Sequence, residues 1–131
     1  FSTTGNPDCH IILRGGKEPN YDAQSINKVS KELEAANLPA NIMIDLSHAN
    51  SRKQHDAQIQ VGEDVAKQIA NGDKRIIGTM IESHLVAGRQ DVTPNKELVY
   101  GQSITDACLG WENSVELIET LAAASNARRN S

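Results

Sequence analysis

The sequence predicts an α/β fold organised around a parallel sheet. Three short apolar runs are each followed by a stretch in which apolar residues recur with helical periodicity. Each run also ends in a side chain that can hold a metal ion or an anion, and sites in parallel sheets form at the carboxyl ends of the strands. The apolar runs are residues 10–13, 42–44 and 76–81.

The first predicted unit is a strand over residues 10–13 followed by a helix that starts after Asp22, a favourable N-cap residue. A glycine-containing loop separates the two. The helix should end at Asn37, because Pro39 lies just beyond it and cannot continue a helix. The apolar face of this helix consists of Ile26, Val29, Leu33 and Ala36.

The second and third units repeat this pattern. The strand over residues 42–44 leads into a polar loop, residues 47–51, and then into a helix that Gly72 should end. The third strand, residues 76–81, is almost continuously apolar, as expected of a parallel strand that is covered on both faces. The apolar face of the second helix consists of Val61, Val65 and Ile69.

Residues 84–105 show no periodicity, which predicts a long loop, and loops of that length in compact domains are usually functional. A final helix should follow, with Ser103, Thr105 or Asp106 as its N-cap. Two arginines near its far end, Arg128 and Arg129, suit the negative end of the helix dipole. Its inward face is predicted to be Trp111, Val115, Ile118 and Ala122.

The composition is that of a soluble globular protein, with 38% hydrophobic residues and a formal net charge of -4. Lys and Arg are scattered, so nothing indicates binding to nucleic acid. No apolar stretch is long enough for a membrane span, and residues 1–4 do not resemble a signal peptide. We therefore expect a cytoplasmic protein. Cys9 and Cys108 are then expected to be reduced and buried, without a disulfide.

Three parallel strands leave two open edges and cannot cover both faces, so such a sheet would be marginal by itself. A closed barrel of eight strand–helix units takes about 250 residues, whereas this sequence has 131. We therefore expect residues 1–131 to be a single, partial TIM (β/α)8 barrel domain.

Three residues at the predicted strand and helix ends, His48, Glu82 and Asp106, could together hold a divalent metal ion. One imidazole and two carboxylates suit manganese, iron, cobalt or zinc, and ligands from three separate units could form an open site. Their spacing is not a metal motif, so each could instead be a hydrogen-bonded polar residue at a strand end. Asp106 could also simply cap the last helix.

Arg14 is the candidate for anion recognition, because its guanidinium matches phosphate or carboxylate and the adjacent glycines allow backbone amides to approach. A structural salt bridge is the alternative. Asp45 could orient a ligand imidazole from behind, or pair with a neighbouring cation.

Four segments, in order along the chain, resemble the type I 3-deoxy-D-arabino-heptulosonate 7-phosphate (DAHP) synthases. The resemblance extends from about Asp8 to Arg129 and concerns the C-terminal part of those enzymes, in particular their phenylalanine-sensitive form. The segments are DCHIILRGGKEPNY at residues 8–21, MIDLSHANS at 43–51, MIESHL at 80–85 and SITDAC at 103–108.

The resemblance implies the C-terminal (βα) units of a TIM barrel, in a tetrameric enzyme that condenses phosphoenolpyruvate with erythrose 4-phosphate in the first step of the shikimate pathway. It makes His48, Glu82 and Asp106 three of four metal ligands and Arg14 a phosphoenolpyruvate-binding residue. The fourth ligand, a cysteine on an earlier strand, has no counterpart in this sequence. The Lys-Pro-Arg-Thr loop for erythrose 4-phosphate has none either.

Three functional hypotheses follow. The chain could be a segment of the synthase that is inactive without the N-terminal part. Alternatively, it could be a stable, non-catalytic fragment that associates through exposed strand edges, with an N-terminal partner segment or with a second copy. A different metal-dependent aldolase on the same barrel is the third possibility.

Overall fold

The computed structural model describes residues 1–130 and contains a three-stranded parallel sheet in the order β1-β2-β3. The strands are β1 (Ile11–Leu13), β2 (Ile42–Asp45) and β3 (Ile76–Met80). All three pair in parallel, with a register shift after Ile42 where β2 meets β3. Helices follow β1 and β2 along the chain, so the predicted α/β class with three parallel strands is confirmed.

Helix α1 (Ala23–Ala35) begins and ends where the sequence predicts. The Asp22 carboxylate accepts hydrogen bonds from the backbone N–H groups of Gln24 and Ser25, at 2.9 and 3.0 Å. After the helix, Asn37 adopts a left-handed conformation with φ of 56°. This residue therefore ends the helix by the geometry that asparagine tolerates better than most residues.

Helix α2 (Ala57–Ala70) carries the predicted apolar face, and Gly72 follows it with φ of 96°. The core lies between this face, α1 and one side of the sheet. The prediction that β3 is covered on both faces is wrong, because Ile77 is 49% exposed. Ile12 of β1 is likewise 51% exposed. No described element covers that second face. The core residues of the sheet and of α1 and α2 include Leu13, Ile26, Leu33, Ile42, Ile44, Val61, Val65, Ile69 and Ile76.

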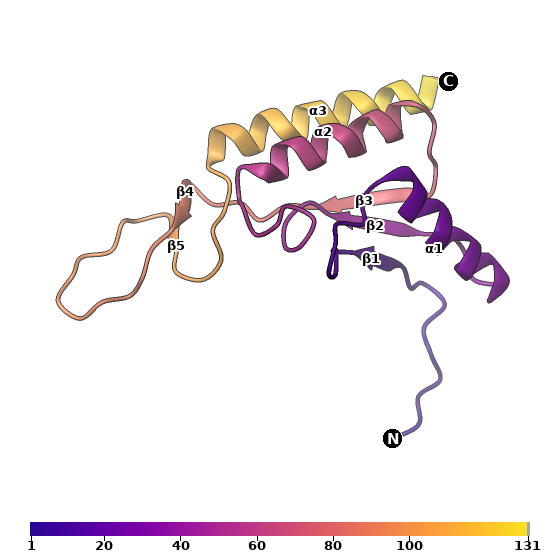
Figure 1. Ribbon diagram of the computed structural model, residues 1–131, viewed down its shortest axis with the longest axis horizontal. Helices are drawn as coiled ribbons and strands as arrows, with labels where there is room; N and C mark the ends of the chain where they lie inside the picture. Colours follow the sequence, from indigo (N-terminus) through magenta and orange to yellow (C-terminus); the bar gives the residue numbers. More distant parts are fainter. Residues whose placement is uncertain (131) are drawn as a thin grey trace.

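The predicted loop at residues 84–105 contains two short strands, β4 (Val86–Arg89) and β5 (Gln102–Ser103), which pair in parallel. They form the base of an arm that extends away from the sheet (Figure 1). Strands this short do not produce a detectable alternation of polar and apolar residues. They are held by backbone hydrogen bonds such as Val86 N–H to Gly101 O at 2.8 Å.

Helix α3 (Trp111–Asn130) differs from prediction in its start and in its inward face. It begins beyond Asp106, so none of the three proposed caps is its N-cap. Trp111 and Ile118 are 60% and 57% exposed, and the buried residues are Ser114, Leu117 and Ala124. The reason is that α3 lies along α2 (Figure 1), where Leu117 occupies the space that Gly62 leaves. A Cβ at Gly62 would lie 2.5 Å from Leu117 Cδ1.

The C-terminal end of α3 is tied to the sheet by Arg128. Its guanidinium Nη1 donates to the backbone oxygens of Asp73 and Ile76, at 2.8 and 2.9 Å. The expectation that both cysteines are buried is wrong for Cys9, which lies in the exposed segment before β1. Cys108 is partly buried, and both thiols are free. Among the described residues, no helix is long and apolar enough to cross a membrane.

Replacing Leu117 by alanine should lower the free energy of unfolding by about 2–4 kcal/mol, because it leaves a cavity beside Gly62. The matched variant Ile118→Ala, at the neighbouring exposed position, should change it by no more than about 0.5 kcal/mol. Urea unfolding of the 131-residue chain measures both. Equal losses for the two variants would contradict the packing of Leu117 against Gly62.

Candidate metal and anion site

The four sequence-predicted site residues converge on one cavity of about 300 Å³. Arg14, His48 and Glu82 follow β1, β2 and β3, and Asp106 follows β5. The carboxyl ends of parallel strands lie at the same edge of a sheet, which explains how residues so distant in sequence meet. The cavity is lined by Arg14, His48, Ser51, Lys53, Glu82, Asp106 and Ala107.

The imidazole and the two carboxylates form a group that could hold a metal ion. One possible ligand atom from each of His48, Glu82 and Asp106 lies within 4.8 Å of the others. His48 Nε2 is 3.7 Å from Glu82 Oε1. Asp106 is exposed, so its carboxylate can rotate toward an ion between the other two. This combination of one nitrogen and two oxygen ligands fits a divalent ion of the first transition row.

The Asp45 carboxylate contacts the imidazole of His48 at Nδ1, the ring nitrogen farther from Glu82, and this contact can orient the ring. The carboxylate is 2.7 Å from His48 Nδ1, and it also accepts hydrogen bonds from the Ser47 backbone N–H and hydroxyl. Asp45 is 2% exposed, so its geometry is fixed by burial. When a carboxylate binds Nδ1–H, the other ring nitrogen is left to act as a ligand. That nitrogen, Nε2, faces Glu82.

The backbone of the loop after β2 is constrained at several positions. His48, Arg52 and Lys53 all have positive φ, between 47° and 60°. The carbonyl oxygen of His48 accepts hydrogen bonds from the Lys53 backbone N–H, at 2.8 Å, and from the Ser51 hydroxyl, at 3.2 Å. This closed loop brings Lys53 back to the cavity that His48 lines.

Glu82 is held by Gln58, a residue that the sequence analysis missed. The Gln58 side chain accepts a hydrogen bond from the Glu82 backbone N–H at 2.9 Å and donates one to the Glu82 backbone oxygen at 3.1 Å. One signal for it exists in the sequence. Gln58 lies three residues before Val61, on the apolar face of α2, where a polar residue needs a buried partner.

Asp106 comes near Glu82 because the chain returns from the arm alongside the residues after β3. Ser83 forms an isolated parallel bridge with Leu109, whose backbone N–H donates to the Glu82 oxygen at 2.9 Å. Gly88 forms an antiparallel bridge with Cys108. These bridges fix the segment that carries Asp106. Local periodicity could not predict them, since they join residues twenty or more positions apart.

Arg14 is positioned by close contact between the loops after β1 and β2. Gly15 has φ of 77°, and a Cβ there would lie 2.7 Å from the Ala49 Cβ. The side-chain amide of Asn50 donates to the backbone oxygens of Leu13 and Asp45, at 3.1 and 2.7 Å. Arg14 thus extends from a loop that is fixed against the His48 loop.

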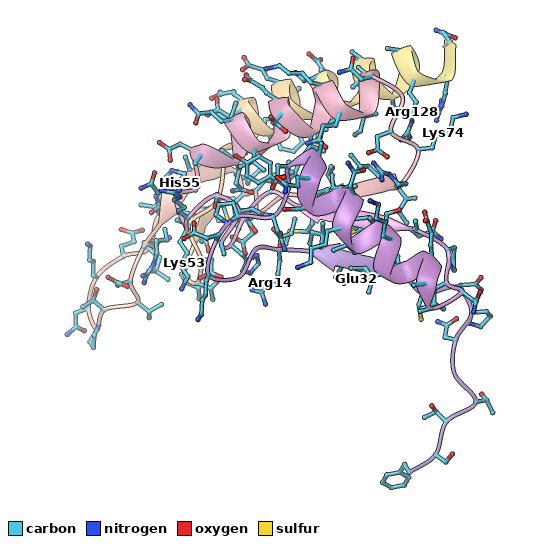
Figure 2. All side chains as sticks on the ribbon, turned by 45° about the vertical axis from the view of Figure 1, so that its right-hand side comes forward. Arg14, Glu32, Lys53, His55, Lys74 and Arg128 are labelled. Carbon is cyan, nitrogen blue, oxygen red and sulfur yellow. The ribbon has the colours of Figure 1, made fainter. Side chains whose placement is uncertain are left out.

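Lys53, a second cation beside the cavity, was also missed by the sequence analysis. Arg14 and Lys53 extend from the same side of the ribbon (Figure 2), and both line the cavity. A lysine in a polar loop has no distinguishing signal in the sequence, because most such residues are solvated. Together the two side chains add positive charge to a cavity that the carboxylates of Glu82 and Asp106 also line.

The pKa of the Glu82 carboxyl is raised above its usual value, chiefly because partial burial disfavours the charged form. The nearby His48 opposes this shift, and the like charge of Asp106 adds to it. A metal ion between these groups would relieve the repulsion between the carboxylates and favour their ionised forms. The electrostatics of the cavity therefore suit a bound cation.

Comparison with known proteins identifies relatives of the chain. The sequence profile of the DAHP synthetase I family matches residues 1–119. The Phe-sensitive phospho-2-dehydro-3-deoxyheptonate aldolase of Escherichia coli K12 is 57% identical over 128 residues, which cover 98% of this chain and 37% of the relative. The tyrosine-inhibited enzyme of Schizosaccharomyces pombe is 54% identical over 132 residues, covering 97% and 36%.

A solved structure shows the same fold. That structure, of phospho-2-dehydro-3-deoxyheptonate aldolase from Francisella tularensis SCHU S4, matches with a TM-score of 0.92 and 44% sequence identity. The match covers 98% of this chain and 37% of that chain. The chain thus spans little more than a third of the length of its relatives. The expected partial TIM barrel is confirmed.

Replacing Gly15 by alanine should lower the free energy of unfolding by about 1–3 kcal/mol, from the positive φ and the contact with Ala49. Gly16→Ala is the matched control, because a Cβ there meets no atom within 4 Å. It should change stability by no more than about 0.5 kcal/mol. Urea unfolding distinguishes the two, and a harmless Gly15→Ala would contradict the close approach of the loops.

Neutralising Asp106 by Asp106→Asn should lower the pKa of Glu82, and His48→Gln should raise it further, since these neighbours act in opposite directions. Carbon-13 NMR titration of the metal-free chain measures the shift, with Glu116→Gln on exposed α3 as the control. The pKa of Glu82 is higher in the folded chain than in the unfolded chain. The free energy of unfolding should therefore fall as the pH rises from the Glu82 pKa of the unfolded chain to that of the folded chain. Shifts of the same sign in both site variants would contradict this account.

Proposed function

Because the chain belongs to the DAHP synthetase I family, we propose that it supplies the metal ligands and a substrate-binding arginine of a DAHP synthase site. His48, Glu82 and Asp106 are the ligands, and Arg14 binds phosphoenolpyruvate. Asp45 holds the imidazole from behind. The observation that carries the proposal is the convergence of three ligand atoms within 4.8 Å at the strand ends.

The residues fit a divalent ion, with manganese, iron, cobalt and zinc all compatible with nitrogen and carboxylate ligands. The fixed contact of Asp45 with His48 Nδ1 and the raised pKa of Glu82 both support a site that is completed by a cation. Three protein ligands leave room for a further ligand and for substrate.

The proposed reaction joins phosphoenolpyruvate and erythrose 4-phosphate. A bound ion would supply Lewis acidity at the aldehyde oxygen of erythrose 4-phosphate. Arg14 pairs with an anionic group of phosphoenolpyruvate and directs its methylene carbon toward the aldehyde carbon, where the new bond forms. Water then adds at the enol carbon, and the carbon–oxygen bond to phosphate breaks. Lys53 contributes further positive charge beside these anions.

The site needs further strands to act. The described residues 1–130 provide a parallel sheet of three strands, the chain covers 37% of the E. coli relative, and one face of the sheet is open at Ile12 and Ile77. We propose that the 131 residues alone are inactive and that activity requires the N-terminal part of the barrel, in a homo-oligomeric enzyme or from a partner segment. The exposed edges of β1 and β3 are where such strands would pair.

Mixing the chain with the N-terminal segment of the E. coli relative should give phosphoenolpyruvate consumption that depends on erythrose 4-phosphate and a divalent ion. The 131-residue chain alone should give none. Glu82→Gln should reduce turnover of the mixture by at least about 100-fold, because it removes a charged ligand. The matched variant Glu116→Gln, on an exposed face of α3, should leave turnover unchanged.

Two results would contradict this proposal: turnover by the chain alone, or full activity of the Glu82→Gln mixture. The alternative is a stable, non-catalytic fragment that associates through its strand edges, which the open second face of the sheet favours. It predicts a dimer in native mass spectrometry and a mixture without turnover. A folded monomer would contradict that alternative.

A further inference from the structure

We propose that Gln58 is a positioning residue that sets the geometry of Glu82 toward the metal ion and thereby the affinity of the site. It does so without touching the ion. The inference rests on the proposed metal site and goes further, because it names the group that fixes one ligand relative to another.

The Gln58 side-chain amide pairs with the Glu82 backbone. The amide contacts both the N–H and the oxygen of Glu82, at 2.9 and 3.1 Å. Two hydrogen bonds to one residue fix its orientation as well as its position. Gln58 is 0% exposed, so water cannot replace either bond. Removing the amide leaves the Glu82 N–H without its partner, which costs about 1–3 kcal/mol, whereas the Glu82 oxygen keeps its hydrogen bond from the Leu109 N–H at 2.9 Å.

Gln58 also joins the elements that carry two different ligands. Its Nε2 also donates to the backbone oxygen of His55, at 3.2 Å. His55 lies near the end of the loop that begins at His48, and Glu82 follows β3. A single amide therefore links the His48 loop to the Glu82 backbone. In this arrangement His48 Nε2 lies 3.7 Å from Glu82 Oε1.

A purely structural role would be the alternative, and the same helix provides a reference for it. Gln68 of α2 also donates to a distant backbone oxygen, that of Tyr21, at 2.9 Å. Neither Gln68 nor Tyr21 lines the cavity of the candidate site. Loss of the Gln68 amide should therefore leave metal binding unchanged, whereas loss of the Gln58 amide should weaken it.

The test compares Gln58→Met with Gln68→Met by titrating each variant of the 131-residue chain with Co²⁺. Methionine is close to glutamine in volume but has no amide, so both substitutions remove the amide and keep the size of the side chain. Gln58→Met should weaken Co²⁺ binding by about 10–100-fold, as loss of an outer contact to a metal ligand typically does. It should also alter the visible absorption of bound Co²⁺, which reports ligand geometry. Gln68→Met should bind Co²⁺ with unchanged affinity and an unchanged spectrum.

A second measurement does not depend on the variants folding. In nitrogen-15 NMR of the unmodified chain, addition of Zn²⁺ should shift the side-chain amide signals of Gln58 and leave those of Gln68 in place. Unchanged Gln58 signals on Zn²⁺ binding, or equal Co²⁺ affinity and spectra for Gln58→Met and the unmodified chain, would overturn the inference alone. Failure of the unmodified chain to bind either ion would overturn the proposed metal site as well.

Discussion

The network of buried polar groups at the carboxyl end of β2 determines the arrangement of the whole site. The carboxylate of Asp45 is buried and therefore needs hydrogen-bond partners, which the Ser47 hydroxyl and His48 Nδ1 provide. Asn50, also buried, binds the ends of β1 and β2 through their backbone oxygens. Buried polar groups without partners would be costly, so the loop has little freedom to adopt another conformation. That constraint places His48 and the neighbouring Arg14 loop together.

Hydrogen bonds to buried polar groups also hold the chain after β3 and the arm. Gln58, at the start of α2, satisfies the backbone of Glu82, and the bridge between Ser83 and Leu109 brings the chain back beside it. Asp106 reaches the cavity only through this return. The site is therefore built from backbone contacts between loops, and the ionisable side chains are placed by them. The raised pKa of Glu82 is a consequence of this enclosed position beside another carboxylate.

Most of the fold was predictable from the sequence, because helical periodicity and caps such as Asp22 and Gly72 are local signals. The positions of Arg14, His48 and Glu82 followed from strand ends, a rule that holds for parallel sheets in general. Gln58 and Lys53 were not predicted. Their places depend on contacts across long sequence distances and on residues with positive φ. The short strands β4 and β5 were missed for the same reason, since their pairing is visible only in three dimensions.

The face of α3 shows why a correct helix can still be assigned the wrong orientation. Both the predicted face, with Trp111 and Ile118, and the observed face, with Leu117, carry apolar side chains. Periodicity alone could not choose between them. Packing against α2 determines which face is buried, because Gly62 leaves room for Leu117 and allows the two helices to pack closely. The α2–α3 contact and the core between β2 and α2 support the loops that carry His48 and Glu82, and the arm adds Asp106, so the candidate metal group forms without a closed barrel.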